Sequence, residues 1–497
     1  MIDSLLNRFS MYKVLSITLT SLWVIALIFS FFGIISYSPL AMVASIGVLG
    51  TVVFLASLLF GLLFGVKVHT ESSYITAFIL FFIFTPTLQV GGLATLALGA
   101  LIAAASKFVL VYKGRHIFNP AVIAAFIIGL TGLGVATWWV ATPPLFIFTL
   151  LFGFLIIQKT RRFLTGGIFL GITIPLLVIT QLGYGSTLPE AFYLLLSWPI
   201  FYFSAFMLTE PQTLPPKKWQ QVFEVIIVAI LFAVPFTIGP FHSNLTFALV
   251  VGNIIAFGFS RRQAIYLKFK GFSQLTPMSR ELTFTSAKKI AFEAGQYVEL
   301  SLPHKGTDLR GERRSFSITS SPTDKDVKLG IKFYDPSSSF KKALGSLAEG
   351  TTITATSING SFTLPKDAAK PLLFIAGGIG ITPFMSQLRL LKKRHEKRDI
   401  VLVYAVSSTQ DLAYKDELEA MDVTVIVVTK SDTALTHKAW TLVNEARITE
   451  EVLRDTIDDI AKRQVYISGP PFMIDGTKKA LKRLGVRRIK TDYFIGY

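Results

Sequence analysis

The chain has 497 residues, of which 52% are hydrophobic and only 16% are charged, whereas soluble proteins carry roughly 25% charged residues. It contains no cysteine, which excludes disulfides, thiolate zinc sites and iron–sulfur clusters held by this chain. A formal charge of +18 is compatible with a nucleic-acid partner. We expect no nucleic-acid partner, because basic residues also gather in cytoplasmic loops and on surfaces near anionic lipid.

Residues 1–262 consist mainly of long apolar runs, which predicts a polytopic α-helical membrane domain. A membrane-spanning helix needs about 20 apolar residues, so the sequence predicts about ten spans. The third and fourth spans have the least distinct boundaries, because Pro86 and Gly91-Gly92 interrupt them. The predicted spans lie near 14–36, 41–66, 73–88, 91–111, 120–137, 143–158, 164–182, 191–208, 221–238 and 243–260.

Basic residues are confined to alternate loops of this half. The intervening loops 36–40, 134–144, 183–190 and 239–244 contain no lysine or arginine. Because lysine and arginine accumulate on the cytoplasmic side, we expect both termini in the cytoplasm and the chain in the inner membrane, in contact with lipid. The orienting residues are Arg8, Lys13, Lys67, Lys113, Arg115, Lys159, Arg161, Arg162, Lys217, Lys218, Arg261 and Arg262.

The histidines restrict the redox centre of the membrane half. A transmembrane haem pair needs histidines that project from facing helices. Only His69, His116 and His242 lie in this half, and all three fall at predicted span ends or in loops. We therefore expect no haem and no other metal, and the remaining choices are a flavin or a quinone.

Two stretches of the membrane half, Ser106–Ala121 and Phe206–Thr213, are similar to one membrane family. It comprises the B subunit of sodium-translocating NADH:quinone reductase and the D subunit of the Rnf complex. These relatives bind flavins, with FMN joined through its phosphate to the threonine of Ser-Gly-Ala-Thr. The nearest match is Tyr184-Gly-Ser-Thr187, in which Tyr184 replaces the serine. The resemblance implies FMN at Thr187; the alternative is a polar turn that precedes Pro189.

The rest of the chain changes pattern twice. Residues 263–366 contain short alternating strands broken by glycine, proline and serine, which predicts an antiparallel β-barrel. Residues 367–497 alternate strands with helices, which predicts an α/β domain with a parallel sheet. The expected order is a membrane domain, a barrel and an α/β nucleotide-binding domain.

A series of short motifs runs through these two segments. Their order and spacing resemble the ferredoxin–NADP reductase superfamily over 264–497, which implies FAD in the barrel and NAD(P)H on the parallel sheet. The motifs are Gly295-Gln-Tyr297, Arg314-Ser-Phe-Ser317, Ser338–Leu344, Gly360-Ser-Phe362, Phe374–Pro383, Val465–Met473 and Asp492–Tyr497.

The resemblance assigns the flavin site to two motifs. Arg314 offers a fixed fork of donors for a flavin phosphate, and Phe316 offers a flat face for the isoalloxazine ring. Ser317 is expected to hydrogen-bond the reactive flavin nitrogen. The amides of a helix that begins near Ser339 are expected to hold pyrophosphate. The complete expected set is Arg314, Ser315, Phe316, Ser317, Ser339, Phe340 and Lys341.

The nucleotide site is assigned in the same way. Glycines after the apolar strand Leu372–Ala376 let the backbone approach a dinucleotide closely. Ser468 stands where the family has a cysteine near the nicotinamide, and Phe494 matches the terminal aromatic that shields the flavin. With Ser317, these two form the expected catalytic set. The expected nucleotide-binding residues are Gly377, Gly378, Gly380, Thr382, Pro383, Gly469, Pro470 and Met473.

These patterns predict a membrane-bound flavin oxidoreductase that moves electrons from cytoplasmic NAD(P)H through FAD to a membrane flavin or quinone. NADH is favoured over NADPH because the loop Ser407–Asp411 has no basic residue for a 2′-phosphate. The sequence leaves open the final acceptor, a partner electron-transfer protein and ion coupling. Two alternatives remain: a cytoplasmic-side reductase with a passive membrane anchor, and a transporter that senses NADH.

Overall fold

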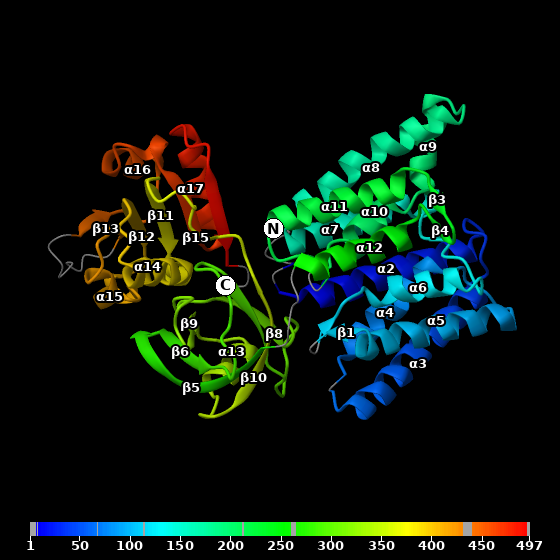
Figure 1. The fold of residues 1–497 in the computed structure, drawn as a ribbon, viewed down its shortest axis with the longest axis horizontal. Coiled ribbons are helices and arrows are strands. Elements are labelled where there is room, and N and C mark those ends of the chain that lie inside the picture. Colours follow the sequence, from blue (N-terminus) through cyan, green and yellow to red (C-terminus); the bar gives the residue numbers. More distant parts are fainter. Residues whose placement is uncertain are drawn as a thin grey trace. The chain divides into compact units, whose positions relative to one another are not determined.

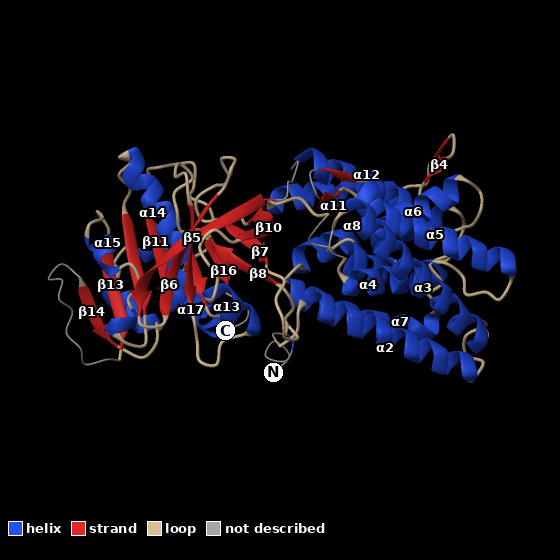
Figure 2. Cartoon of the chain, turned by 90° about the horizontal axis from the view of Figure 1, so that it is seen from below, coloured by secondary structure: helices blue, strands red, loops and turns tan. Residues whose placement is uncertain are grey.

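A computed structural model describes residues 6, 8–66, 68–112, 115–210, 213–259, 265–430 and 440–494, without the side chains of Arg115 and Thr356. The chain divides into two compact units, Met1–Gln263 and Ala264–Tyr497. The first is built from helices and the second contains the two large sheets (Figure 1 and Figure 2).

Among the described residues of the first unit, five helices are long and apolar enough to cross a membrane. They are α2 (Met11–Phe31), α3 (Pro39–Phe64), α5 (Val90–Val109), the segment Pro143–Thr160 that contains α7 (Phe146–Thr160), and α8 (Phe163–Gly183). A sixth span results if the segments Leu188–Ser197 and Ile200–Met207, bent by 54°, count as one. The other helices are α4 (Thr70–Ile83), α6 (Pro120–Leu130), α9 (Leu188–Leu194), α10 (Ile200–Tyr202), α11 (Lys218–Ala233) and α12 (Leu245–Phe259).

Helix breakers explain why several predicted spans are shorter than expected. Each of the ten apolar runs contains a helix, but α4 ends three residues before Pro86, and α6 ends before Gly132, which has φ 70°. The predicted span 191–208 bends at Pro199, and Phe203–Met207 continues as a π-helix. Proline removes a backbone donor and clashes with the preceding turn, which accounts for the end of α4 and the bend at Pro199. A glycine at positive φ is a common helix end, which accounts for the end of α6. A count of ten spans therefore stays a prediction.

The core of the helical unit contains interlocked aromatic rings. Trp139 packs edge-on against Phe81, at 5.2 Å between ring centroids, and lies 5.5 Å from Phe82. Its indole nitrogen donates a 2.6 Å hydrogen bond to the carbonyl of Phe81. Phe82 lies 5.9 Å from Tyr202, which packs in parallel on Phe206 at 4.6 Å. Large rings from distant segments thus fix the positions of the helices.

The second unit begins with a six-stranded antiparallel sheet, in the order β8-β7-β10-β5-β6-β9. An isolated bridge between Ile318 and Leu329 joins the end of β8 to β9, the opposite edge strand. A short helix, α13 (Ser339–Gly345), buries Phe340 and Leu344 in the core of this sheet. The strands are β5 (Ile265–Thr276), β6 (Ser279–Thr285), β7 (Tyr297–Ser301), β8 (Arg313–Ser317), β9 (Val327–Lys332) and β10 (Thr352–Asn359).

The second sheet is parallel throughout, in the order β14-β13-β12-β11-β15-β16. One core lies between the sheet and α14 (Thr382–Arg394) with α15 (Lys415–Glu419); the other is closed by α16 (Glu450–Thr456) and α17 (Pro471–Arg483). The strands are β11 (Leu372–Gly377), β12 (Ile400–Ala405), β13 (Thr424–Thr429), β14 (Thr441–Asn444), β15 (Gln464–Gly469) and β16 (Ile489–Tyr493).

This strand order contains one reversal of direction. From β11 the chain moves outward through β12, β13 and β14, and then returns to the other side of β11 with β15. In open parallel sheets of this kind, ligands bind outside the carboxyl ends of the strands where the order reverses. The point of reversal here lies between Gly377 and Ser468, at the ends of β11 and β15.

Candidate nucleotide and flavin sites

Two glycine-containing turns meet at the reversal point of the parallel sheet. A Cβ atom on Gly377 would lie 2.4 Å from the sulfur of Met473, and one on Gly380 would lie 2.4 Å from the carbonyl oxygen of Ser468. Gly378 has φ 54° and Gly469 has φ 152°, both in the region that favours glycine. The turns after β11 and β15 therefore pack together only because these positions carry no side chain.

Ser468 lies buried where these two turns meet. Its side chain is fully buried, and within the described part of the chain its hydroxyl has no hydrogen-bond partner. A buried hydroxyl without a partner is rare, because it forfeits its hydrogen bonds to water. This unused polar group fits a ligand with a polar substituent, such as the carboxamide of a nicotinamide ring.

Thr382 and Pro383, which directly follow the glycine turn and begin α14, stabilise this turn. The hydroxyl of Thr382 donates a 2.9 Å hydrogen bond to the carbonyl of Ile379, and Pro383 lies in the first turn of α14. Both side chains are buried. A Cβ atom on Gly330 of β9 would come within 2.6 Å of the Thr382 methyl group. These two residues therefore shape the turn and pack it against the antiparallel sheet.

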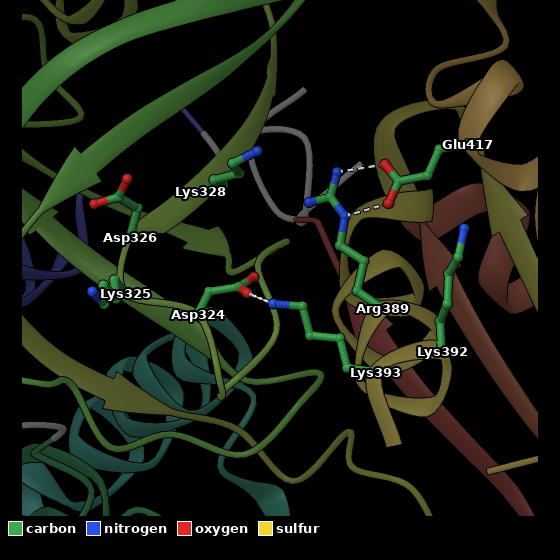
Figure 3. Close-up of a pocket in the computed structure, with 8 residues that line it drawn as sticks. All are labelled: Asp324, Lys325, Asp326, Lys328, Arg389, Lys392, Lys393 and Glu417. Carbon is green, nitrogen blue, oxygen red and sulfur yellow. Dashed lines mark hydrogen bonds and ion pairs between the residues drawn. The ribbon is translucent and has the colours of Figure 1, made fainter. Parts of the chain in front are cut away.

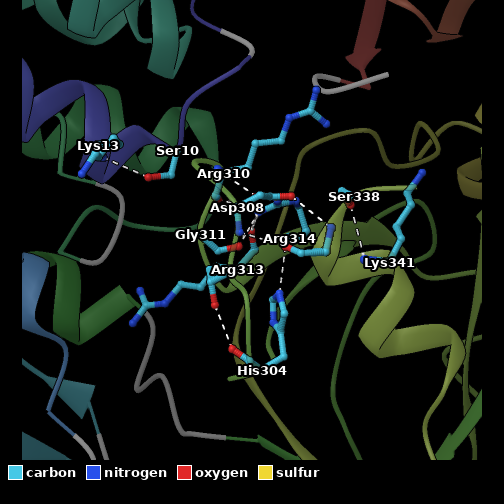
Figure 4. A network of polar contacts seen from close by, with 12 residues as sticks. Ser10, Lys13, His304, Asp308, Arg310, Gly311, Arg313, Arg314, Ser338 and Lys341 are labelled. Carbon is cyan, nitrogen blue, oxygen red and sulfur yellow. Dashed lines mark hydrogen bonds and ion pairs between the residues drawn. The ribbon is translucent and has the colours of Figure 1, made fainter. Parts of the chain in front are cut away.

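The expected flavin phosphate site contains an internal carboxylate. Arg314 donates through Nη1 to three carbonyls of its own loop, those of Arg310, Gly311 and Arg313, and through Nη2 to Asp308 Oδ1 at 3.2 Å. The second oxygen of Asp308 accepts the backbone N–H of Ser339 at 3.1 Å. Figure 4 shows this network. Asp308 thus joins the two groups expected to bind phosphate, and no sequence motif pointed to it.

Positive charge gathers around Lys341, in the first turn of α13. Burial, together with the charges of Arg310, Arg314 and Lys332, lowers the pKa of Lys341 to about 8. Lys341 Nζ donates to the carbonyl of Lys332 at 2.6 Å. Burial opposes ionisation of Asp308, but hydrogen bonds from Arg310 and Ser339 and the charge of Arg314 outweigh it and lower the pKa of Asp308. Such a concentration of cationic groups suits a polyanionic ligand.

The remaining flavin residues occupy β8 and its surroundings. The rings of Phe316 and Phe340 are stacked with centroids 6.0 Å apart, and the Arg314 guanidinium lies 5.3 Å from the Phe340 centroid. Phe340 is fully buried, while Phe316 is half-buried. Ser315 is exposed and Ser317 is buried at the end of the strand. Phe340 therefore supports Arg314 and Phe316, and only Phe316 has ring surface left for a ligand.

Phe494 lies beside the second glycine turn. Its backbone N–H donates a 3.1 Å hydrogen bond to the carbonyl of Gly469, and its ring packs on the core that α14 and α15 cover. Residues 495–497 of the terminal motif lie outside the described residues. Phe494 is thus held close to Ser468, and its role beside the nicotinamide stays a prediction.

Sequence reasoning missed an ion network between the two sheets of this unit. Arg389 of α14 makes a bidentate pair with Glu417, at 2.7 and 2.6 Å, and a 2.9 Å hydrogen bond to Glu281 of β6. It also donates to the carbonyl of Thr319 at 3.0 Å. Burial raises the pKa of Glu281, but the charge and hydrogen bonds of Arg389 outweigh this, so its pKa is lowered overall. Arg389 therefore ties the antiparallel sheet to the helices that cover the parallel sheet.

An open pocket of about 460 Å³ adjoins Arg389 (Figure 3). Charged side chains line it, and none of the glycine-turn residues does. A neighbouring pocket of about 650 Å³ reaches Thr409 and Gln410 in the loop after β12. The acidic residue of that loop, Asp411, pairs with Lys332 at 3.3 Å. A basic group from β9 therefore does lie beside the loop expected to distinguish NADH from NADPH, but it is already paired with a carboxylate.

Thr187 lies in the other unit, as the N-cap of α9. Glu190 Oε2 accepts both the backbone N–H of Thr187 at 2.7 Å and its hydroxyl at 2.8 Å, and Thr187 is exposed. This reciprocal arrangement is a capping box, which the Thr-x-x-Glu pattern could have predicted. The hydroxyl is accessible, but in this structure it stabilises the start of the helix.

The two stretches that suggested a membrane family contact each other. Asn119 Nδ2 donates to Glu210 Oε2 at 2.9 Å, and His116 Nε2 lies 3.9 Å from Glu210 Oε1. The backbone N–H of Asn119 donates to the side-chain oxygen of Asn253 at 2.8 Å. His116 lies in a two-residue strand, His242 in another, and His69 caps α4. A buried polar cluster thus joins α6, α12 and the segment after the π-helix.

Comparison with known proteins matches residues 374–479 to the family described as the oxidoreductase NAD-binding domain. The propane 2-monooxygenase reductase component of Rhodococcus jostii (strain RHA1) is 29% identical over 233 residues, which cover 44% of this chain and 61% of that protein. That of Mycolicibacterium goodii is 34% identical over 194 residues, 38% of this chain and 54% of the relative. This chain therefore spans little more than half the length of these relatives.

A bovine relative is covered more fully. Oxidoreductase NAD-binding domain-containing protein 1 of Bos taurus is 30% identical over 244 residues, which cover 44% of this chain and 77% of that protein. Among solved structures, a ferredoxin NADP+ reductase from Neisseria gonorrhoeae with bound FAD and NADP matches with a TM-score of 0.40 and 19% identity, over 47% of this chain and 99% of that one.

Proposed function

Because the chain belongs to the oxidoreductase NAD-binding domain family, we propose that it is a membrane-bound, NAD(P)H-dependent FAD oxidoreductase that passes electrons to a flavin or quinone in the membrane. One observation carries this proposal. The turns after β11 and β15 meet at the reversal point of the parallel sheet, and the buried hydroxyl of Ser468 lacks a partner there within the described residues. Dinucleotides bind at such reversal points.

The nucleotide would lie across the two glycine turns. Gly377, Gly378 and Gly380 let the backbone approach its pyrophosphate, and Ser468 offers a hydrogen bond to the nicotinamide carboxamide. Phe494 covers the neighbouring surface and must move for the nicotinamide to reach the flavin. NADH is the preferred donor, because Asp411 already neutralises Lys332, the basic group beside the loop after β12.

FAD would be held by the antiparallel sheet. Arg314, Ser339 and Lys341 bind its phosphates, and Phe316 and Ser317 face the isoalloxazine ring and its reactive nitrogen. FAD, when bound, accepts two electrons as a hydride and releases them singly. The residues present fit this role, because the charges of Arg310, Arg314 and Lys332 act on Lys341, and Arg314 pairs with one internal carboxylate, Asp308, whose position an anionic ligand can take.

Electrons would leave through the membrane unit. Each NADH yields NAD+, one proton and two electrons, and a quinone that takes up these electrons also takes up two protons. A second flavin site is proposed at Thr187, on the face opposite the cytoplasm, from the motif Tyr184-Gly-Ser-Thr187 and because Thr187 is exposed. The absence of basic residues from 183–190 supports that orientation.

A second function is supported by the names of two relatives. Both relatives bear the name of a reductase component of propane 2-monooxygenase. If this chain is such a component, its electrons pass to a separate cytoplasmic protein and the helices serve as an anchor.

The full chain, purified in detergent, distinguishes these functions. We expect it to oxidise NADH with a short-chain quinone as acceptor, and Arg314→Ala to lose both FAD and this activity. A flavin-loaded chain that reduces ferricyanide but no quinone, in detergent or in liposomes, would contradict the membrane route and support a separate protein acceptor. An Arg314→Ala chain with unchanged FAD content would contradict the flavin assignment.

A further inference from the structure

The first turn of α17 presents an aromatic ring to solvent at the carboxyl end of β15. Phe472 is 78% exposed, more than any other large apolar side chain among the described residues of this unit. It makes no ring contact with another described residue. A single exposed apolar side chain is ordinary on a protein surface. Its location distinguishes this one, because Phe472 directly precedes Met473, which packs on Gly377 at the reversal point.

The backbone that carries this ring is fixed. Pro470 is the N-cap of α17 and Pro471 is its first residue. The N–H groups of Met473 and Ile474 both donate to the carbonyl of Pro470 at 3.1 Å. Ile474 is fully buried in the core beneath α17. A ring on such a rigid turn loses little freedom when a ligand packs on it, which favours binding.

The ring also lies on one of the two glycine turns, the turn after β15, where a bound dinucleotide would pass. A nicotinamide dinucleotide has a flat base at each end, with the pyrophosphate between them. Ser468 lies at the sheet end of the turn and is buried, whereas Phe472 lies four residues further along and faces solvent. If Ser468 contacts one base and the glycines approach the pyrophosphate, the other base must lie further toward solvent, and Phe472 is the exposed ring that the turn after β15 offers there.

We propose that Phe472 is the adenine platform of this site, a specificity-determining residue that stacks on the adenine of NAD(P)H. The assignment rests on the proposed function. Aromatic side chains bind bases through their faces whatever the base's hydrogen-bonding edge. Phe472 therefore contributes affinity for the adenosine half of the dinucleotide and leaves the reacting nicotinamide untouched.

Two reduced nucleotides test the assignment. The full chain in detergent is assayed with ferricyanide as acceptor, using either NADH or reduced nicotinamide mononucleotide, which has no adenine. We expect Phe472→Ala to raise the KM for NADH about tenfold, the scale of one base–aromatic stack, with kcat unchanged. The KM for the mononucleotide should stay the same, and Phe472→Trp should restore the KM for NADH.

Phe272→Ala is the matched control. Phe272 is 53% exposed on β5, where Arg280 lies 4.5 Å from its ring centroid, and its loss should change neither KM. The assignment is overturned if Phe472→Ala leaves the KM for NADH within about twofold of the parent, if both KM values rise equally, or if Phe272→Ala has the same effect. A parent chain that contains FAD but oxidises neither nucleotide would instead overturn the proposed function, and the assignment with it.

Discussion

Arg314 and Asp308 lie 3.2 Å apart, and the second oxygen of that carboxylate accepts the backbone N–H of Ser339. The groups expected to bind the flavin phosphates therefore converge on one point, although 25 positions separate Arg314 from Ser339 in the sequence. The carboxylate of Asp308 occupies that point.

Asp308→Asn should tighten FAD binding. The carboxylate competes with the flavin phosphates for Arg314 and Ser339, so removal of its charge releases these donors. A partly exposed ion pair contributes about 1 kcal/mol at most, so we expect the Kd for FAD to fall up to about fivefold at low salt. The measurement is quenching of FAD fluorescence on addition of the apoprotein. Weaker FAD binding by Asp308→Asn would show that the carboxylate organises the site instead of competing with the ligand.

Lys341 should make FAD binding depend on pH. Its pKa is lowered to about 8, chiefly by burial and then by neighbouring cations, and a bound phosphate raises it again. The lysine is charged below this pKa, so FAD affinity should be highest there and should fall as pH rises through about 8. Titrations of apoprotein with FAD between pH 7 and 9 test this, and the decline in affinity should begin near pH 8. Lys341→Met should bind more weakly and lose this dependence; an unchanged pH profile in that variant would contradict the assignment.

Gly380→Ala should weaken nucleotide binding. Its Cβ atom would lie 2.4 Å from the carbonyl oxygen of Ser468, so the two turns would have to separate. We expect the KM for NADH to rise by at least about tenfold, because binding geometry at the pyrophosphate is lost. Gly476→Ala is the control, because its Cβ meets nothing within 4 Å and alanine favours the helix. Equal KM values in the two variants would contradict the proposed nucleotide site across the two glycine turns.

Arg389→Met should destabilise the carboxy-terminal unit. The change leaves Glu281 buried without its cation, and such breaks reduce stability by about 3–5 kcal/mol. We expect a fall of several degrees in the Tm of the full chain, followed by near-ultraviolet circular dichroism. Adding Glu281→Gln should recover part of the loss, because the unpaired charge disappears. A double variant less stable than Arg389→Met alone would show that Glu281 contributes through its other partners, Thr319 and Tyr414.

Much of the carboxy-terminal fold could be predicted from sequence. The strand Leu372–Ala376 and the turn after it, Gly377–Pro383, combine a buried apolar run with glycines, and this pattern determines a β-turn-α unit locally. The close approach of Gly380 to Ser468 could not be predicted in the same way. It depends on β15 returning beside β11, which only the strand order specifies.

The residues that sequence reasoning missed are joined by tertiary contacts. Asp308 reaches Ser339 across 31 positions, and Arg389 reaches Glu281 across 108. Neither Asp308 nor Arg389 belongs to a sequence motif. An ion pair requires only that two side chains meet in space, and it sets no fixed spacing between them in the sequence. In the membrane unit, hydropathy located the helices but not their lengths, because Pro199 and Gly132 end or bend helices inside apolar runs.

The most direct test of the central claim is reduction of the bound flavin by NADH. The full chain, purified in detergent and loaded with FAD, is mixed with NADH without oxygen, and the visible flavin absorbance is followed in a stopped-flow instrument. We expect the absorbance to bleach at a rate that saturates with NADH concentration, and Gly380→Ala to require much higher concentrations. A flavin that stays oxidised with both NADH and NADPH would contradict the account.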